Sequence, residues 1–136
     1  MSHVTTSNTP IKHAVLDRIS QGKGWRSSGR SMYSINGVTV HLRHCSYRFH
    51  SLFNINPNTL RAAYEVWICG HKVDDHEYFL LPIEAIRKMY DDPHAYPDRR
   101  HRKIRVVSVI AEKNEAVFAS GGGKALDIAR YRGDVL

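Results

Sequence analysis

The sequence predicts a mixed α/β fold, in which a mixed β-sheet is flanked by helices, and three observations carry that prediction. The dipeptide Asn36-Gly37 stands between two apolar stretches, which is the strongest short signal for a β-hairpin. Apolar residues recur at helical spacing after Pro10 and again after Pro82. Short apolar and aromatic runs account for the remaining strands, and such a mixture favours layers of helix on sheet.

The predicted elements follow one another in the order α-β-β-β-β-α-β-α. Thr9 and Pro10 suit the start of the first helix, because threonine caps a helix and proline is tolerated in its first turn. Apolar and polar residues alternate in the second hairpin strand, so His41 and Arg43 share one face of it. The expected elements are a helix over 11–19, strands over 31–35 and 38–43, a short helical turn over 59–63, strands over 64–69 and 78–81, a helix over 82–90, a strand over 104–110 and a closing helix over 124–132.

Three segments are expected to be loops, because they are rich in small, polar or basic residues and in prolines. They are residues 23–30, 46–59 and 91–103. Residues 1–9 are mostly serine, threonine and asparagine, and we expect them to be disordered. A chain of 136 residues suits one domain, which we place at 10–136.

The charge of the chain points to a polyanionic partner. Lysine and arginine number 20 against 13 acidic residues, which gives a formal net charge of +7. No aspartate or glutamate occurs from Arg18 to Tyr64. A positive surface built from this stretch would need an external counter-charge, and a phosphate backbone is the simplest one. The alternative is a basic protein that is merely soluble.

The order of elements resembles the αβββαβ core of the restriction-endonuclease-like nuclease superfamily. Three passages carry the resemblance, which covers residues 10 to 132. The hairpin Asn36–Arg43 resembles the one that bears the catalytic signature of these nucleases. The strands 64–68 and 78–81, followed by Pro82 and a helix, resemble the passage after that hairpin, and Leu126–Arg132 resembles the C-terminal helix.

The resemblance implies an aspartate on the first hairpin strand and a Glu-x-Lys on the second, which together hold Mg²⁺ and position the attacking water. In this sequence the Glu-x-Lys positions fall on His41 and Arg43, and Asp17 is the acidic residue left as an outer ligand. The catalytic candidates are therefore Asp17, His41 and Arg43. Histidine and arginine do not suit a hard cation, so no metal site and no cofactor are predicted, and Mg²⁺ is expected only if the chain is active.

These observations together predict a DNA-binding protein that keeps a nuclease-like fold and has lost the chemistry. Double-stranded DNA is the expected partner, and dimers are possible because nucleases of this superfamily often dimerise. The alternative for each group of basic residues is that it forms a solvated surface with no binding role. Trp25 fits a base-stacking role or the core. The predicted nucleic-acid-binding residues are Lys23, Arg26, Arg30, Arg43, Arg48, Arg99, Arg100, Arg102 and Lys103.

Two other classes of function stay open at this stage. The chain could be an endonuclease whose metal site is rebuilt from Asp17, Glu65 and Glu77, or His41 and His44 could act as a metal-free acid/base pair on RNA. It could also be an inhibitor or accessory subunit of a DNA-processing or defence system. The sequence has no membrane-spanning run and no secretion signal, so a cytoplasmic location is expected.

Overall fold

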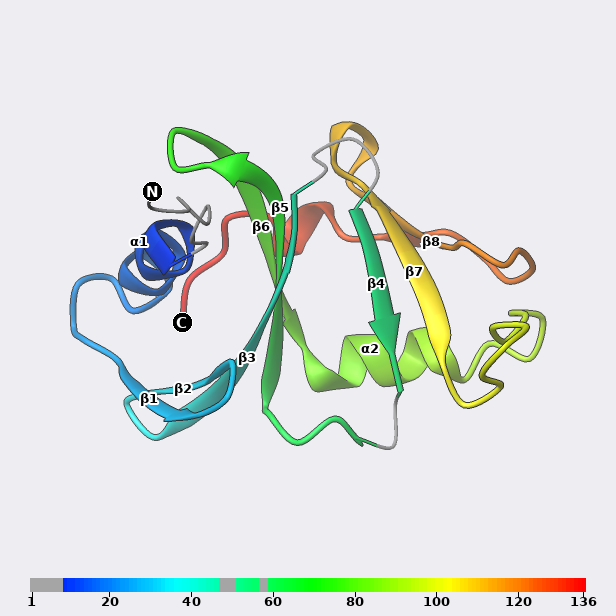
Figure 1. The fold of residues 1–136 in the computed structure, drawn as a ribbon, viewed down its shortest axis with the longest axis horizontal. Coiled ribbons are helices and arrows are strands. Elements are labelled where there is room, and N and C mark those ends of the chain that lie inside the picture. The colour runs from blue at the N-terminus through cyan, green and yellow to red at the C-terminus, as the bar shows by residue number, and fades with distance from the viewer. Residues whose placement is uncertain (1–8, 47–50, 57–58) are drawn as a thin grey trace, which may run out of the picture.

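The computed structural model describes residues 9–46, 51–56 and 59–136, and Figure 1 shows their arrangement. The α-helices are α1 (Thr9–Ile19) and α2 (Ile83–Tyr90), and two short 3-10 helices are η2 (Ala111–Lys113) and η3 (Ala129–Tyr131). The strands are β1 (Arg26–Gly29), β2 (Met32–Ile35), β3 (Val38–Cys45), β4 (Ser51–Ile55), β5 (Tyr64–Lys72), β6 (Asp75–Pro82), β7 (Arg105–Ile110), β8 (Glu115–Phe118) and β9 (Leu126–Asp127).

The strands form two sheets rather than the single sheet that the sequence predicts. Sheet A has the order β1-β2-β3-β5-β6, and sheet B has the order β4-β7-β8-β9. All neighbouring strands run antiparallel except β3 and β5, which run parallel. Between β3 and β5 the chain crosses to sheet B, forms β4 there and returns, as a parallel pair requires.

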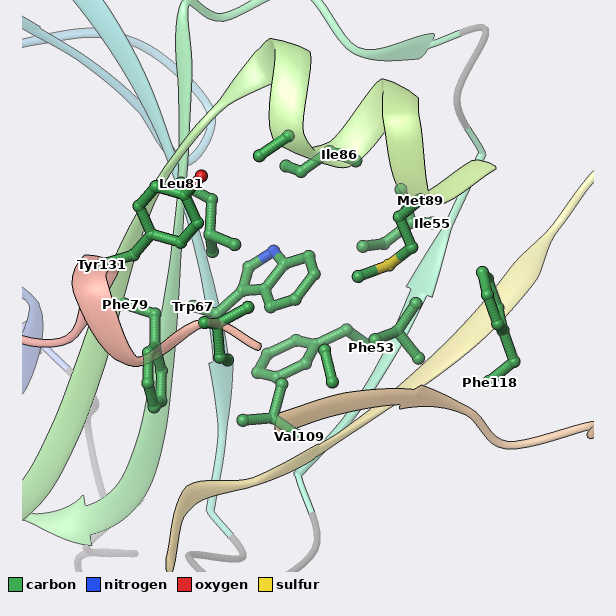
Figure 2. Packing of buried hydrophobic residues seen from close by; sticks show 14 of the residues in the cluster. Phe53, Ile55, Trp67, Phe79, Leu81, Ile86, Met89, Val109, Phe118 and Tyr131 are labelled. Carbon is green, nitrogen blue, oxygen red and sulfur yellow. The ribbon is translucent and has the colours of Figure 1, made fainter. Parts of the chain in front are cut away.

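Two hydrophobic clusters arrange these elements in layers, because each face of sheet A packs against a different partner. One cluster joins α1 to β2, β3, β5 and β6. The other fills the space between sheet A, α2 and sheet B. In Figure 2 the indole of Trp67 from β5 lies among Ile86 and Met89 of α2 and Phe53 of β4. The rings of Trp67 and Phe53 stack with centroids 5.4 Å apart. Sheet A is therefore covered on both faces.

The mixed α/β class is confirmed, and so are several elements. The helices α1 and α2 and the strand β7 lie where the sequence predicts them, and their bounds differ by one or two residues. The hairpin is also confirmed, with φ angles of 50° at Asn36 and 80° at Gly37. Positive φ at both central residues is what a two-residue hairpin turn requires, and asparagine and glycine supply it at low cost.

Four predicted elements are wrong. β1 lies in the expected loop 23–30 and β4 lies in the expected loop 46–59. Of the helical turn expected over 59–63, only Thr59 is in 3-10 helical conformation, and residues 60–63 form no helix. The segment 124–132 is β9 and η3 instead of a closing helix, so sheet A has α1 on one face and α2 with sheet B on the other. The burial pattern near the C-terminus explains the last difference, because the half-buried Leu126 and the buried Ile128 alternate with the exposed Asp127, as in a strand.

Residues 1–8 lie outside the described part of the chain, so the disorder expected for 1–9 stays a prediction there. Thr9 is the first residue of α1. None of the helices that the structure describes is long and apolar enough to span a bilayer.

The two faces of β4 provide a test of the two-sheet arrangement. Phe53 is 4% exposed and Leu52 is 55% exposed. We expect Phe53→Ala to lower the free energy of unfolding by about 3–5 kcal/mol, because it opens a cavity between the sheets. Leu52→Ala on the same strand should change it by less than about 0.5 kcal/mol. Urea unfolding measures both values, and equal effects of the two substitutions would contradict the packing of β4.

Candidate nucleic-acid interface

A hollow of about 500 Å³ lies at the edge of sheet A, beside β1. Lys23 and Arg26 supply its positive charge, and Trp25 forms part of its wall. Arg26 of β1 pairs with Ser34 of β2, and both residues line the hollow. Among the residues that the structure describes, no acidic side chain lines it. Its lining residues are Lys23, Gly24, Trp25, Arg26, Ser34, Asn36 and Gly37.

Trp25 is held in place from two elements. Its indole Nε1 donates a hydrogen bond to Oδ1 of Asp17 on α1, at 2.9 Å. The ring centroid of His13, one helical turn before Asp17, lies 4.8 Å away. Tyr33 of β2 also meets the indole, edge to face, with ring centroids 5.6 Å apart. These contacts fix the orientation of the indole, so its place in the wall of the hollow is built in before any ligand arrives.

A second basic surface is the loop that runs from α2 to β7. Arg99, Arg100, His101, Arg102 and Lys103 are consecutive, and all of them are exposed. The Asp98 carboxylate accepts hydrogen bonds from the backbone N–H groups of Arg100 and His101, at 3.0 and 2.9 Å. The backbone also closes the loop, because the N–H of Asp98 donates to the carbonyl of Ile104 at 3.0 Å. The loop thus has a defined shape.

The start of this loop is fixed to the glycine turn 121–123. The Asp92 carboxylate accepts hydrogen bonds from the N–H groups of His94 and Lys124, at 2.9 and 2.8 Å, and these bonds lower the pKa of Asp92. Tyr96 donates its N–H to the carbonyl of Gly121. The φ angle of Gly122 is +73°, and a Cβ there would lie 1.9 Å from the carbonyl oxygen of His94. Only glycine allows this approach.

The carboxylates of Asp92 and Asp98 therefore bind backbone N–H groups and do not neutralise the cations of the loop. In the described part of the chain, no carboxylate forms an ion pair with the predicted contacts Arg99, Arg100, Arg102 or Lys103. Tyr96, which lies three residues before Arg99, is 60% exposed. A cationic loop beside an exposed aromatic ring offers both phosphate contacts and a stacking surface.

The predicted binding residues do not share one surface. β1 and the loop before β7 lie at opposite ends of the long axis of the molecule in Figure 1. Lys23, Arg26 and Arg30 belong to the first end and are exposed. Arg43 belongs to neither, because its side chain reaches into the space between the sheets. Arg48 lies outside the described residues.

Arg43 takes part in a buried polar cluster around Glu65, which is 1% exposed. The register pairs His41 with Glu65 across β3 and β5. Nδ1 of His41 lies 3.0 Å from Oε2 of Glu65, and Nε of Arg43 donates to Oε1 at 2.5 Å. Nη1 of Arg43 donates to the carbonyl of Asn54 on β4, at 3.2 Å. The cluster stabilises a carboxylate that would otherwise be costly to bury.

The three catalytic candidates lie on two sides of sheet A. Asp17 is on α1, which packs against one face, whereas His41 and Arg43 project from the opposite face. His44 projects toward the α1 side, where its ring nitrogen contacts the carbonyl of Gly70 and desolvation by burial lowers its pKa. The structure therefore does not bring His41 and His44 together.

The residues do not fit the Mg²⁺ site that the resemblance implies. Asp17 is bonded to Trp25, Glu65 to His41 and Arg43, and Glu77 pairs with Arg132. These three carboxylates do not converge. Among the residues that the structure describes, no group of three or more His, Cys, Asp or Glu side chains is placed to hold a metal ion.

Sequence reasoning missed two features of these sites. Glu65 entered only as a possible metal ligand, although a single acid in the apolar run 64–69 signals a buried carboxylate that needs a cationic partner. Ser34 and Asn36 were not predicted to be part of a binding site. No local signal identifies them, because their place beside Arg26 depends on the pairing of β1 with β2.

Comparisons with protein-family models, with curated proteins and with solved structures return no match to this chain. The function of the chain is therefore inferred from the geometry of its own residues.

Two glycines with similar backbone angles test how the basic loop is anchored. Gly37 has a φ of +80° and open space where a Cβ would lie, whereas a Cβ at Gly122 would collide with the backbone of His94. Both alanine variants carry the cost of a positive φ, about 1–2 kcal/mol. We expect Gly122→Ala to lose at least about 1 kcal/mol more, and to speed hydrogen exchange in residues 92–96. Equal losses would contradict the close contact.

The Glu65 cluster has its own test. Glu65→Gln keeps the shape of the side chain and removes its charge, so Arg43 loses its ionic partner. We expect the free energy of unfolding to fall by about 2–3 kcal/mol, measured with urea. Glu112 is exposed, and Glu112→Gln is the matched control with an expected change below about 0.5 kcal/mol. If Glu65→Gln leaves the free energy of unfolding unchanged, the cluster adds little to stability.

Proposed function

We propose that this chain binds nucleic acid, and double-stranded DNA in particular, through the loop Arg99–Lys103. The observation that carries the proposal is the form of that loop: five consecutive basic or ionisable side chains are exposed on a backbone closed by Asp98. Such an arrangement favours affinity for a phosphate backbone, because each cation that contacts a phosphate releases a condensed counterion. The hollow beside β1 is a separate basic surface at the other end of the molecule, and the duplex contact proposed here does not depend on it.

The proposal includes a nuclease-like fold without metal chemistry. The hairpin of β2 and β3, followed by β5, β6 and α2, is the part of the fold that matches the resemblance to the restriction-endonuclease-like superfamily. Two further strands, β1 and β4, also lie between α1 and α2, and β7, the strand after α2, belongs to sheet B. Where that superfamily holds a metal, this chain has a single buried carboxylate already bound by His41 and Arg43. A carboxylate that is paired in this way is not available to hold the metal ion that phosphodiester hydrolysis needs in that superfamily.

Charge reversal tests the role of the loop. We expect the triple variant Arg99→Glu, Arg100→Glu and Arg102→Glu to weaken duplex binding. The negative slope of log K against log salt should become shallower by about 3, because each lost phosphate contact removes about 0.9 from it. Fluorescence anisotropy with a labelled duplex at several salt concentrations measures both. Lys72, Lys88 and Lys113 are exposed on other elements, and their reversal to glutamate gives a control of equal net charge. An equal loss in both variants would contradict a specific role for the loop.

A cleavage assay separates binding from catalysis. We expect supercoiled plasmid to stay intact when the protein is added with Mg²⁺ or Mn²⁺. Nicking that a chelator abolishes would favour the metal-dependent endonuclease instead. Absence of binding to DNA at low salt would overturn the proposal as a whole.

A further inference from the structure

The hollow beside β1 differs in kind from the loop before β7. The loop offers mainly charge. The hollow combines two cations, an aromatic wall, a hydroxyl from Ser34 and an amide from Asn36. Its volume of about 500 Å³ falls within the range of small-molecule sites, roughly 300–1,000 Å³. A site of this size and composition suits one molecule with a flat ring, hydrogen-bonding edges and a negative charge.

From these features we infer that the hollow binds an unpaired nucleotide of a single-stranded nucleic acid, with its base against Trp25. This inference rests on the proposed function and names the form of nucleic acid that this end of the molecule takes. A base inside a duplex has both faces covered by its neighbours, so it cannot reach an aromatic wall without leaving the stack. An unpaired base has a free face.

Each part of the nucleotide has a matching group in the hollow. The base stacks on the indole, an interaction that accepts any base because every base has a π-face. The phosphate lies against Lys23 and Arg26, whose charges no lining carboxylate opposes. The amide of Asn36 and the hydroxyl of Ser34 can each donate and accept hydrogen bonds, which suits the edge of a base.

The indole is prepared for this role by contacts that lie outside the hollow. Asp17 binds its Nε1, and His13 and Tyr33 pack against the ring. A ring fixed before binding loses little conformational freedom when a base stacks on it, which favours affinity. Asp17, one of the catalytic candidates, thereby becomes a positioning residue for Trp25.

Intrinsic fluorescence tests this inference directly, because the chain has only two tryptophans. Trp67 is fully buried between the sheets, so it gives a constant background, whereas Trp25 reports on the hollow. The full-length protein is titrated with a short single-stranded oligothymidylate, a blunt duplex, thymidine monophosphate and inorganic polyphosphate. We expect the single strand to quench the emission at concentrations where the duplex and polyphosphate leave it unchanged.

Variants assign the signal to the site. Trp25→Ala should remove the quenching and weaken single-strand binding about tenfold, the loss typical of one stacking partner. Lys23→Glu combined with Arg26→Glu keeps the indole and should weaken single-strand binding. Reversal of the exposed Lys72 and Lys88 to glutamate, which changes the net charge equally, should leave the quenching intact. The wild-type titration needs no substitution, so the inference can be judged even if Trp25→Ala fails to fold.

The outcomes separate the inference from the proposed function. Duplex binding by anisotropy without single-strand quenching would overturn the inference and leave the proposed function standing. Quenching by polyphosphate would overturn the stacking of a base, and quenching by the free monophosphate alone would overturn the claim of a strand. If neither duplex nor single strand binds, both proposals fail.

Discussion

β3 and β5 lie side by side and run parallel, so the chain between them has to leave the sheet at one end and re-enter at the other. In this protein the crossover is used to build β4, the first strand of sheet B. Parallel pairs are stable where both faces are covered, and β5 meets that condition with six consecutive buried residues. α1 covers one face, and α2 with sheet B covers the other. The two-sheet architecture follows from this pairing.

The same burial explains the cluster around Glu65. A carboxylate near the start of a strand buried on both faces has no access to bulk water, so it requires partners from neighbouring elements. β3 supplies His41 and Arg43 from the same face, and Arg43 extends the connection to the backbone of β4. One arginine thus joins sheet A to sheet B. This internal use of Arg43 also shows why a residue count overstates the charge available to an external partner.

The sequence allowed the local elements to be predicted better than the arrangement of strands. Asn36-Gly37 identified the hairpin because its turn needs two positive φ angles, and Pro82 identified the start of α2. β4 was readable, because Phe53 and Ile55 alternate with Leu52 and Asn54. β1 was not, since Arg26–Gly29 has no strand propensity and is a strand only because β2 lies beside it. The division into two sheets depends on contacts between distant residues, which no local pattern encodes.

The acid-free stretch from Arg18 to Tyr64 shows how far composition can be taken as a guide to a surface. Its residues contribute to α1, to the edge of sheet A, to the space between the sheets and to β4. The cations of this stretch are therefore distributed over different surfaces, because alternate residues of a strand face opposite sides and because the chain crosses to sheet B between β3 and β5. On the outside, this stretch leaves exposed cations on separate elements, such as Arg18 and Arg61, and one small hollow with an aromatic wall. The cations best placed for phosphate come instead from Arg99–Lys103, where acids are close in sequence but bound to the backbone. The direction of a side chain, rather than its count, decides which charges a partner meets.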